Sequence, residues 1–153
     1  MKIGLSLDGL LCDTESLKTE WLRRLGDDSF IRDAGFWAAL KPYTDAGPSV
    51  KLLSVNHQVY VFAERPKSMF MPTRAWMKNN VGLVLNKDRL IMPAIPRYDC
   101  RLLGISHYID SDPAVIENLK IETVAPITTY YVDRQQGGSL LQTVEEICES
   151  LRS

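Results

Sequence analysis

Residues 3–13 read IGLSLDGLLCD, and this stretch decides the fold. It opens inside a continuous apolar run, KIGLSL at 2–7, of the length and character of a strand that is covered on both faces. An acidic turn at Asp8 and Gly9 follows, and then the start of a helix. We therefore expect these residues to form the central strand of a sheet, with Ser6 and Asp8 at its carboxyl end.

Outward from this strand, helical and strand patterns alternate. Thr14 is the expected N-cap of the first helix, and Gly26 is placed to end it. Helices are expected over residues 14–25, 49–55, 72–80, 98–103, 112–119 and 139–151, with one or two short ones within 28–43, and strands over 58–63, 82–86, 106–110 and, weakly, 122–127. Such alternation predicts an α/β fold, in which a parallel sheet lies between helices that are joined to it by right-handed crossovers.

Composition limits the classes of protein that the chain can belong to. A length of 153 residues suits one domain, and the formal net charge of −1 comes without a dense Lys/Arg run, so we expect no duplex nucleic acid as partner. The three cysteines show no C-x-x-C spacing and are expected to be reduced thiols. No apolar run has the roughly 20 residues of a membrane span, so we expect a soluble, cytoplasmic protein without a membrane partner.

Candidate site residues follow from the rule that parallel sheets bind ligands beyond the carboxyl ends of their strands. The rule selects Ser6 and Asp8, then Ala63, Glu64 and Arg65, then Asn86 and Lys87, and finally Asp110, Ser111 and Asp112. If the strands are neighbours, the carboxylates of Asp8, Asp110 and Asp112 converge on one crevice. Such a group of carboxylates usually binds Mg²⁺, which often also binds phosphate oxygens. The alternative is that these side chains only cap helices, for which Ser111 or Asp112 before Pro113 is well suited.

The order of three motifs, IGLSLDGLLCD, VYVFAERP and YIDSDPAVIENL, resembles the haloacid dehalogenase (HAD) superfamily of phosphohydrolases. Residues 36–66, FWAALKPYTDAGPSVKLLSVNHQVYVFAERP, look like the small-cap group that includes the 5'(3')-deoxyribonucleotidases. The resemblance implies a Rossmann-like α/β fold in a single HAD-like domain over 1–153. Its core would comprise residues 1–13 and 45–153, and residues 14–44 would form a small helical cap.

The resemblance also implies roles for individual residues. In the family, the first strand ends in an acid that attacks phosphorus, any residue, a second acid and Gly. Asp8 and Gly9 match the second acid, which serves as general acid/base, and its glycine, whereas Ser6 occupies the nucleophile position. Asp8 and Asp110 would hold the metal, and Asp112 lies one place beyond the usual adjacent acid.

The phosphate-binding positions match less well. Ala63 stands where the family has a Thr or Ser hydroxyl, while Arg65 matches a flanking residue of the nucleotidase-like group. The lysine that neutralises the phosphate has Arg97 as its nearest cationic match and Lys87 as a more distant candidate. Two groups that touch the transferred phosphoryl group are thus absent, and loss of a nucleophile costs on the order of 10⁶ in turnover.

We therefore expect a pseudophosphatase, a HAD-like protein that has lost phosphohydrolase activity and acts in ligand binding or protein interaction. Its Mg²⁺ would bind weakly or not at all, and its partner would be a small phosphorylated ligand, a nucleotide or a protein. The alternative is an active Mg²⁺-dependent phosphohydrolase of nucleotides or small phosphomonoesters. A Ser-His-Asp site is not favoured, because His57 and His107 begin strands and so lie at the opposite edge of the sheet.

Two apolar groups have both a functional and a structural interpretation. Phe36, Trp37 and Tyr43 are suited to stacking on a nucleobase at the mouth of the crevice or to packing the cap against the core. The stretch KSMFMPTRAWM at 67–77 holds three methionines with Phe70 and Trp76, which suit an adaptable interface or fill a core equally well.

Overall fold

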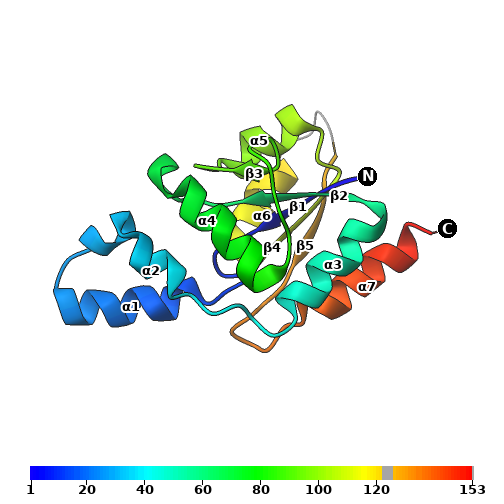
Figure 1. Cartoon of the computed structure of the whole chain (residues 1–153). Coiled ribbons are helices and arrows are strands. Elements are labelled where there is room, and N and C mark those ends of the chain that lie inside the picture. Colours follow the sequence, from blue (N-terminus) through cyan, green and yellow to red (C-terminus); the bar gives the residue numbers. More distant parts are fainter. Residues whose placement is uncertain (122–125, 153) are drawn as a thin grey trace.

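The computed structural model describes residues 1–121 and 126–152 and contains a five-stranded sheet. The strands are β1 (Lys2–Ser6), β2 (Gln58–Phe62), β3 (Leu90–Ile91), β4 (His107–Asp110) and β5 (Thr128–Tyr131). They lie in the order β3-β2-β1-β4-β5, and every neighbouring pair is parallel. The prediction of an α/β fold with the first strand at the centre of a parallel sheet is confirmed (Figure 1).

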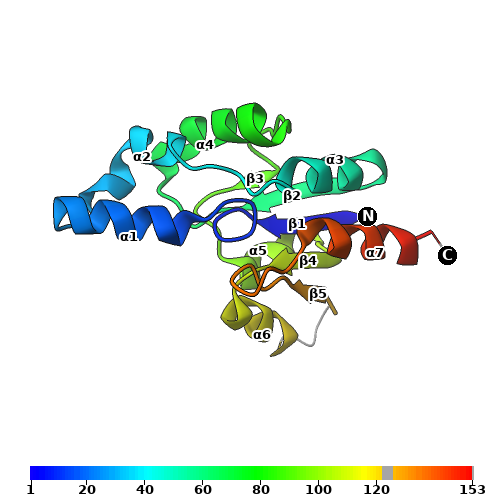
Figure 2. The same ribbon diagram turned by 90° about the horizontal axis from the view of Figure 1, so that it is seen from below.

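Helices cover both faces of this sheet (Figure 2). On one face lie α3 (Ala46–Asn56), α4 (Phe70–Trp76) and α7 (Leu140–Ser150), and on the other lie α5 (Pro96–Leu103) and α6 (Pro113–Ile121). The first crossovers, through α3 and α4, use one face, and the next two, through α5 and α6, use the other. This is the doubly wound, Rossmann-like arrangement.

The alternation of side chains along β1 divides the core in two. Ile3 and Leu5 point into the larger cluster with α3 and α7, while Gly4 and Ser6 point to the face of α5 and α6. On that second face Phe62 and Tyr108 meet edge to face, with ring centroids 5.4 Å apart, directly over Gly4. The central strand is therefore buried on both sides, which explains its continuous apolar run.

Residues 14–44 form a helical segment of their own, which extends beyond the carboxyl ends of the strands (Figures 1 and 2). It contains α1 (Thr14–Leu25), η1 (Ser29–Arg32) and α2 (Ala34–Ala38). The N-cap of α1 is Asp13, whose carboxylate accepts from Ser16 N at 3.2 Å, and not Thr14 as predicted. Gly26 ends the helix in the left-handed conformation, as expected.

The prediction of the third strand was wrong. Residues 82–86 have no strand structure, and β3 comes later, at Leu90 and Ile91. The apolar run GLVLN follows a helical turn, η3 (Met77–Val81), and only Leu85 of it is buried. Of the weak strand expected over 122–127, residues 122–125 lie outside the described part of the chain, and β5 begins just after it.

Of the helices in the described ranges, none has both the length and the apolar character to cross a membrane.

Gly4 gives a test of the packing at the centre of the sheet. A Cβ at this position would lie 2.8 Å from Tyr108 Cδ2 and 3.1 Å from Phe62 Cε1. We expect Gly4→Ala to lower the free energy of unfolding by about 2 kcal/mol through overpacking, as measured by urea denaturation. Gly47→Ala in α3 is the matched control, because its Cβ would come no closer than 3.6 Å to Val81 O. Equal stability of the two variants would contradict the packing argument.

Candidate functional site

The candidate site lies where the direction of strand succession reverses, between β1 and β4. The chain proceeds outward from β1 to β2 and β3, and then returns to β4 and β5 on the other side. Crossovers on either side of this point run on opposite faces, so the carboxyl ends of β1 and β4 border a crevice. Ser6 ends β1 and Asp110 ends β4, which places both at that crevice.

A turn at Gly9 carries the chain from β1 over the crevice. Gly9 has φ of +88°, and a Cβ there would lie 2.7 Å from Ser111 Oγ. Both the left-handed backbone and the close approach require glycine. The turn is closed by Gly9 N, which donates to Cys12 O at 2.9 Å, so Asp8 is held beside the ends of β1 and β2.

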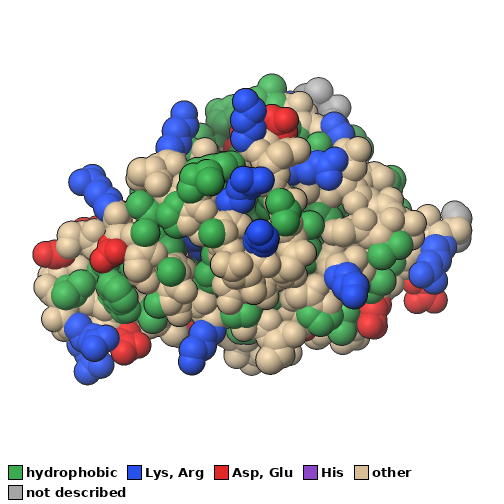
Figure 3. Space-filling model, in the orientation of Figure 1, with side chains coloured by type: hydrophobic (Ala, Val, Ile, Leu, Met, Phe, Trp, Pro, Cys, Tyr) green, Lys and Arg blue, Asp and Glu red, His purple; other side chains and the backbone are tan. Residues whose placement is uncertain are grey.

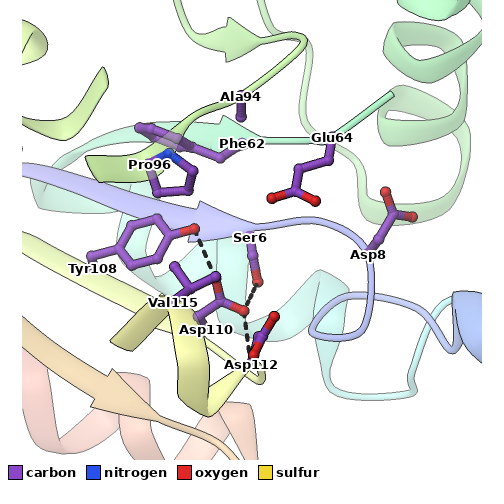
Figure 4. Close-up of a pocket in the computed structure, with 10 residues that line it drawn as sticks. All are labelled: Ser6, Asp8, Phe62, Glu64, Ala94, Pro96, Tyr108, Asp110, Asp112 and Val115. Carbon is purple, nitrogen blue, oxygen red and sulfur yellow. Dashed lines mark hydrogen bonds between the residues drawn. The ribbon is translucent and has the colours of Figure 1, made fainter. Parts of the chain in front are cut away.

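A cavity of about 90 Å³ lies in the crevice (Figure 4). Four carboxylates face it from three strand ends, and its other polar groups are the hydroxyls of Ser6 and Tyr108. Figure 4 shows Glu64 reaching in from the end of β2, opposite Asp110. The full lining consists of Ser6, Asp8, Phe62, Glu64, Ala94, Pro96, Tyr108, Asp110, Asp112 and Val115.

Asp110 is the most constrained of these carboxylates. Asp110 is only 4% exposed, and both of its carboxylate oxygens accept hydrogen bonds. Oδ1 accepts from Ser6 Oγ at 2.9 Å and from Asp112 N at 2.9 Å, and Oδ2 accepts from Tyr108 Oη at 2.9 Å. The Ser6 hydroxyl, which the resemblance places at the nucleophile position, thus donates to Asp110.

Burial dominates the electrostatics of this group. Loss of solvent raises the pKa of Asp110 above its ordinary value, although the bonds from Asp112 N, Tyr108 and Ser6 act in the opposite direction. The pKa of Tyr108 is raised well above its usual range, first by burial and then by the neighbouring Asp110 carboxylate. Tyr108 is therefore a hydrogen-bond donor and not a base.

Asp8 is held by a different set of partners. Arg65 donates two hydrogen bonds to the Asp8 carboxylate, from Nε to Oδ2 at 3.0 Å and from Nη2 to Oδ1 at 2.7 Å. Thr14 Oγ1 donates a third, to Oδ1 at 2.6 Å. Figure 4 shows the Asp8 carboxylate directed away from Asp110. The acid to which the resemblance assigns the general acid/base role is therefore held in a bidentate ion pair.

Arg65 itself is buried, with a side chain that is 0% exposed. Its Nη1 donates to Thr73 Oγ1 in α4 at 3.0 Å, and its guanidinium lies 4.2 Å from the centre of the Trp37 ring in α2. Because a buried arginine must keep its charge, these contacts and Asp8 replace the water that it has lost. Arg65 does not line the cavity.

The remaining predicted phosphate positions do not line this cavity, although Arg97 lines an adjoining hollow of about 230 Å³ that shares Glu64 and Val115 with it. Ala63 packs into the larger core cluster, Arg97 is exposed on α5 with Nη2 donating to Tyr98 Oη at 2.9 Å, and Lys87 is exposed in the turn before β3. Lys87 was expected after a strand, and the misplaced third strand explains the error. Asp112 does line the cavity, and its Oδ1 also accepts from Ala114 N at 2.9 Å, as a cap of α6 would.

A wider hollow of about 440 Å³ adjoins the first and shares Asp8 and Asp112 with it. Tyr43 lines it, and the guanidinium of Arg134 lies 4.2 Å from the centre of the Tyr43 ring. Phe36 and Trp37 instead belong to the buried core, at 0% and 2% exposed. The packing interpretation therefore holds for these two aromatic residues, and neither is available to stack on a base.

The carboxylates do not fit a Mg²⁺ ion as they are arranged. Both carboxylate oxygens of Asp8 accept hydrogen bonds from Arg65 and Thr14. Both oxygens of Asp110 accept hydrogen bonds from Ser6, Tyr108 and the backbone N–H of Asp112. In the described ranges, no three His, Cys, Asp or Glu side chains are grouped so that they could hold a metal. A cation would have to displace these donors to reach the oxygens that the resemblance assigns to it.

Other nucleophiles and bases lie elsewhere or are inert. His107 begins β4 and His57 directly precedes β2, so both stand at the amino-terminal edge of the sheet, as predicted. Cys12 is close to Asp8, with Sγ 3.9 Å from Oδ1, but burial raises the pKa of its thiol to about 12. Its thiolate is therefore not populated at neutral pH.

Sequence reasoning missed Tyr108 as a side chain of the cavity, and it placed Glu64 at the carboxyl edge of the sheet without giving it a role. The spacing of both residues indicates the face on which they lie, because side chains two positions apart along an extended chain point to the same face of the sheet. Tyr108 is two residues before Asp110, and Glu64 is two residues after Phe62.

No model of a known protein family matches the chain. A search of curated proteins finds no match either.

The buried carboxylate predicts a pH dependence of stability. The pKa of Asp110 in the folded protein lies above 3.8, its ordinary value, so the folded state keeps a proton that the unfolded chain has already released. The contribution of Asp110 to stability therefore falls as the pH rises from 3.8 through the raised pKa, and it is constant above.

Asp110→Asn cannot titrate and keeps an acceptor for the neighbouring donors. We expect the unfolding free energy of the wild type minus that of Asp110→Asn to decrease through this pH range and then to level off. Urea denaturation at pH values from about 3 to 8, with a chelator present, measures the difference. A difference that is flat or that increases with pH would show that the folded site does not favour the protonated acid.

Proposed function

We propose that the chain is a pseudophosphatase, a HAD-like protein without phosphoryl transfer that acts by binding. The observation that carries the proposal is the hydrogen bond from Ser6 Oγ to Asp110 Oδ1, at 2.9 Å. It joins the position of the family's attacking acid to the position of its metal-binding acid. A neutral hydroxyl therefore stands where the resemblance requires a nucleophilic carboxylate.

Ser6 has no means of becoming a nucleophile in this setting. A serine attacks only when a neighbouring base takes its proton. The acid next to Ser6 is Asp110, whose two oxygens already accept from Ser6 Oγ, Asp112 N and Tyr108 Oη. Both histidines are at the other edge of the sheet.

The charges around the cavity also disfavour phosphate. Glu64, Asp110 and Asp112 line it with no Lys or Arg among the lining residues, and Asp8 is the one acid there that has a cationic partner in Arg65. An anionic phosphoryl group inside this cavity would face these carboxylates, while Arg97 and Arg134 line the adjoining hollows. The cavity of about 90 Å³ is also far below the roughly 300–1,000 Å³ of common ligand sites.

We expect the wild-type protein to hydrolyse no phosphomonoester above the buffer rate. A panel of p-nitrophenyl phosphate and nucleoside 5'- and 3'-monophosphates with Mg²⁺, followed by phosphate release, measures this. Mg²⁺-dependent turnover that Asp110→Asn abolishes and that Arg23→Gln, an exposed position in α1, leaves intact would sink the proposal and favour the active phosphohydrolase. The convergence of Asp8, Asp110 and Asp112 on one cavity is the observation in favour of that second function.

Ser6→Asp tests whether the nucleophile position is the missing part of a metal site. The new carboxylate would take the place of a donor 2.9 Å from Asp110 Oδ1, so we expect a loss of about 1–3 kcal/mol without divalent cations. Saturating Mg²⁺ should restore about 2–3 kcal/mol, which thermal denaturation detects as a rise in Tm.

Ser6→Asn is the matched control, since it has nearly the same size and no charge. We expect its Tm, like that of the wild type, to be insensitive to Mg²⁺. An equal Mg²⁺ effect on all three proteins would show that the cation binds without the acid at position 6, against the proposal.

A further inference from the structure

Another surface of interest lies on α4, which covers the same face of the sheet as α3 and α7. Three helical segments follow one another from Lys67 to Val81: η2 (Lys67–Met69), α4 and η3. Their buried positions recur every three or four residues and fill the core, with Met69 7%, Trp76 3% and Met77 0% exposed. The core interpretation of the methionine-rich stretch is thus correct for these three side chains.

The opposite side of the same helical segments is basic, with one exposed apolar residue. Lys67, Met71, Arg74 and Lys78 recur at spacings of four, three and four residues, which places them along one helical face. Met71 is the methionine of the stretch that faces solvent, at 63% exposed. A helix of this kind ordinarily presents mixed charges to water.

The segment after η3 is hydrogen-bonded to α4. Arg74 Nε donates to Leu85 O at 2.6 Å, which holds residues 82–87 against the helix. Val84, at 60% exposed, and the exposed Lys87 belong to this held segment. We call the six residues the α4 surface: Lys67, Met71, Arg74, Lys78, Val84 and Lys87.

The charge of the α4 surface is uncompensated. The sequence from Pro66 to Lys87 contains no Asp or Glu. Within the part of the chain that the structure describes, no carboxylate pairs with Lys67, Lys78 or Lys87. Figure 3, in which α4 faces the viewer, shows Lys and Arg beside hydrophobic side chains over this helix, while the acidic side chains lie over other elements.

We propose that the α4 surface binds an acidic, amphipathic segment of another protein. Carboxylates of the partner would face the three lysines, and an apolar side chain of the partner would cover Met71 and Val84. Charge complementarity selects this class of partner, and the exposed thioether and valine supply the apolar contact that such a segment needs. The inference does not depend on the chemistry of the crevice.

Other polyanions fit this surface less well. Phe70 is half-buried and Trp76 is buried, so no exposed aromatic ring lies on the α4 surface for nucleobases to stack on. An anionic membrane would be held more firmly by exposed Trp, Phe or Leu side chains beside the lysines, and the α4 surface has none of these residues.

The test uses a fluorescein-labelled peptide of about twelve residues that places Leu and Glu on opposite faces of a helix. We expect saturable binding in fluorescence anisotropy, which salt weakens without abolishing it. Lys67→Glu with Lys78→Glu should raise the Kd at least about tenfold, and Met71→Ser should raise it about threefold even in high salt.

Arg23→Glu with Arg32→Glu is the matched control, because both arginines are exposed in residues 14–44 and the change in net charge is the same. This control should change the Kd by less than about twofold. Each variant is first checked for an unchanged thermal unfolding transition.

Parallel measurements with vesicles of phosphatidylcholine and phosphatidylserine, and with polyuridylate, distinguish the other partners. Binding to either of these without binding to the peptide would overturn the proposal. So would equal weakening by the two charge-reversal pairs, or no binding of the peptide at all. None of these results depends on whether the protein hydrolyses phosphomonoesters.

Discussion

One buried charge, the guanidinium of Arg65, joins the parts of the structure that surround the crevice. It binds Asp8 in the turn after β1, Thr73 in α4 and the Trp37 ring in α2, so three segments distant in sequence meet on one side chain. A buried guanidinium cannot be left without partners except at a cost of several kcal/mol. The turn that carries Asp8, the helical segment 14–44 and α4 are therefore fixed relative to one another by the same constraint.

This constraint has a chemical consequence at the crevice. The acid at position 8 has both oxygens engaged, by Arg65 and by Thr14. Across the cavity, Asp110 meets a hydroxyl from Ser6 where a second acid would repel it. The two carboxylates that the resemblance assigns to a cation thus have separate partners, an ion pair for Asp8 and hydrogen bonds for Asp110.

The sequence predicted the fold in most of its elements because the signals were local. The apolar run at 2–7, the helix over 14–25 with Gly26 after it, and the carboxyl-edge positions of Asp8 and Asp110 all follow from periodicity and turn residues. The third strand was wrong because a short apolar run such as GLVLN has no period to distinguish strand from coil. The true β3 has two residues and is defined only by its pairing with Val61 and Phe62.

The site was less predictable than the fold for a related reason. Position along a strand indicates which residues reach an edge, so Ser6, Asp8, Asp110 and Asp112 were found. It does not indicate which partner a charge will choose, since the pairing of Arg65 with Asp8 spans 57 residues of sequence. A role as a phosphate ligand and a role as the counter-ion of a neighbouring acid require the same residue type at the same place.

Charge separation across the molecule bears on how it would meet another molecule. Acidic side chains outnumber basic ones in the two hollows at the carboxyl edge of the sheet. The charged lining residues are Asp8, Asp13, Glu15, Glu64, Asp110, Asp112, Asp133 and Arg134. The α4 surface is positively charged. It lies on the outer side of the helical segment 67–81, whose inner side is a row of buried side chains. An anionic partner would be attracted to the α4 surface and repelled by the acids at the carboxyl edge, so this charge separation would orient an acidic protein segment on α4.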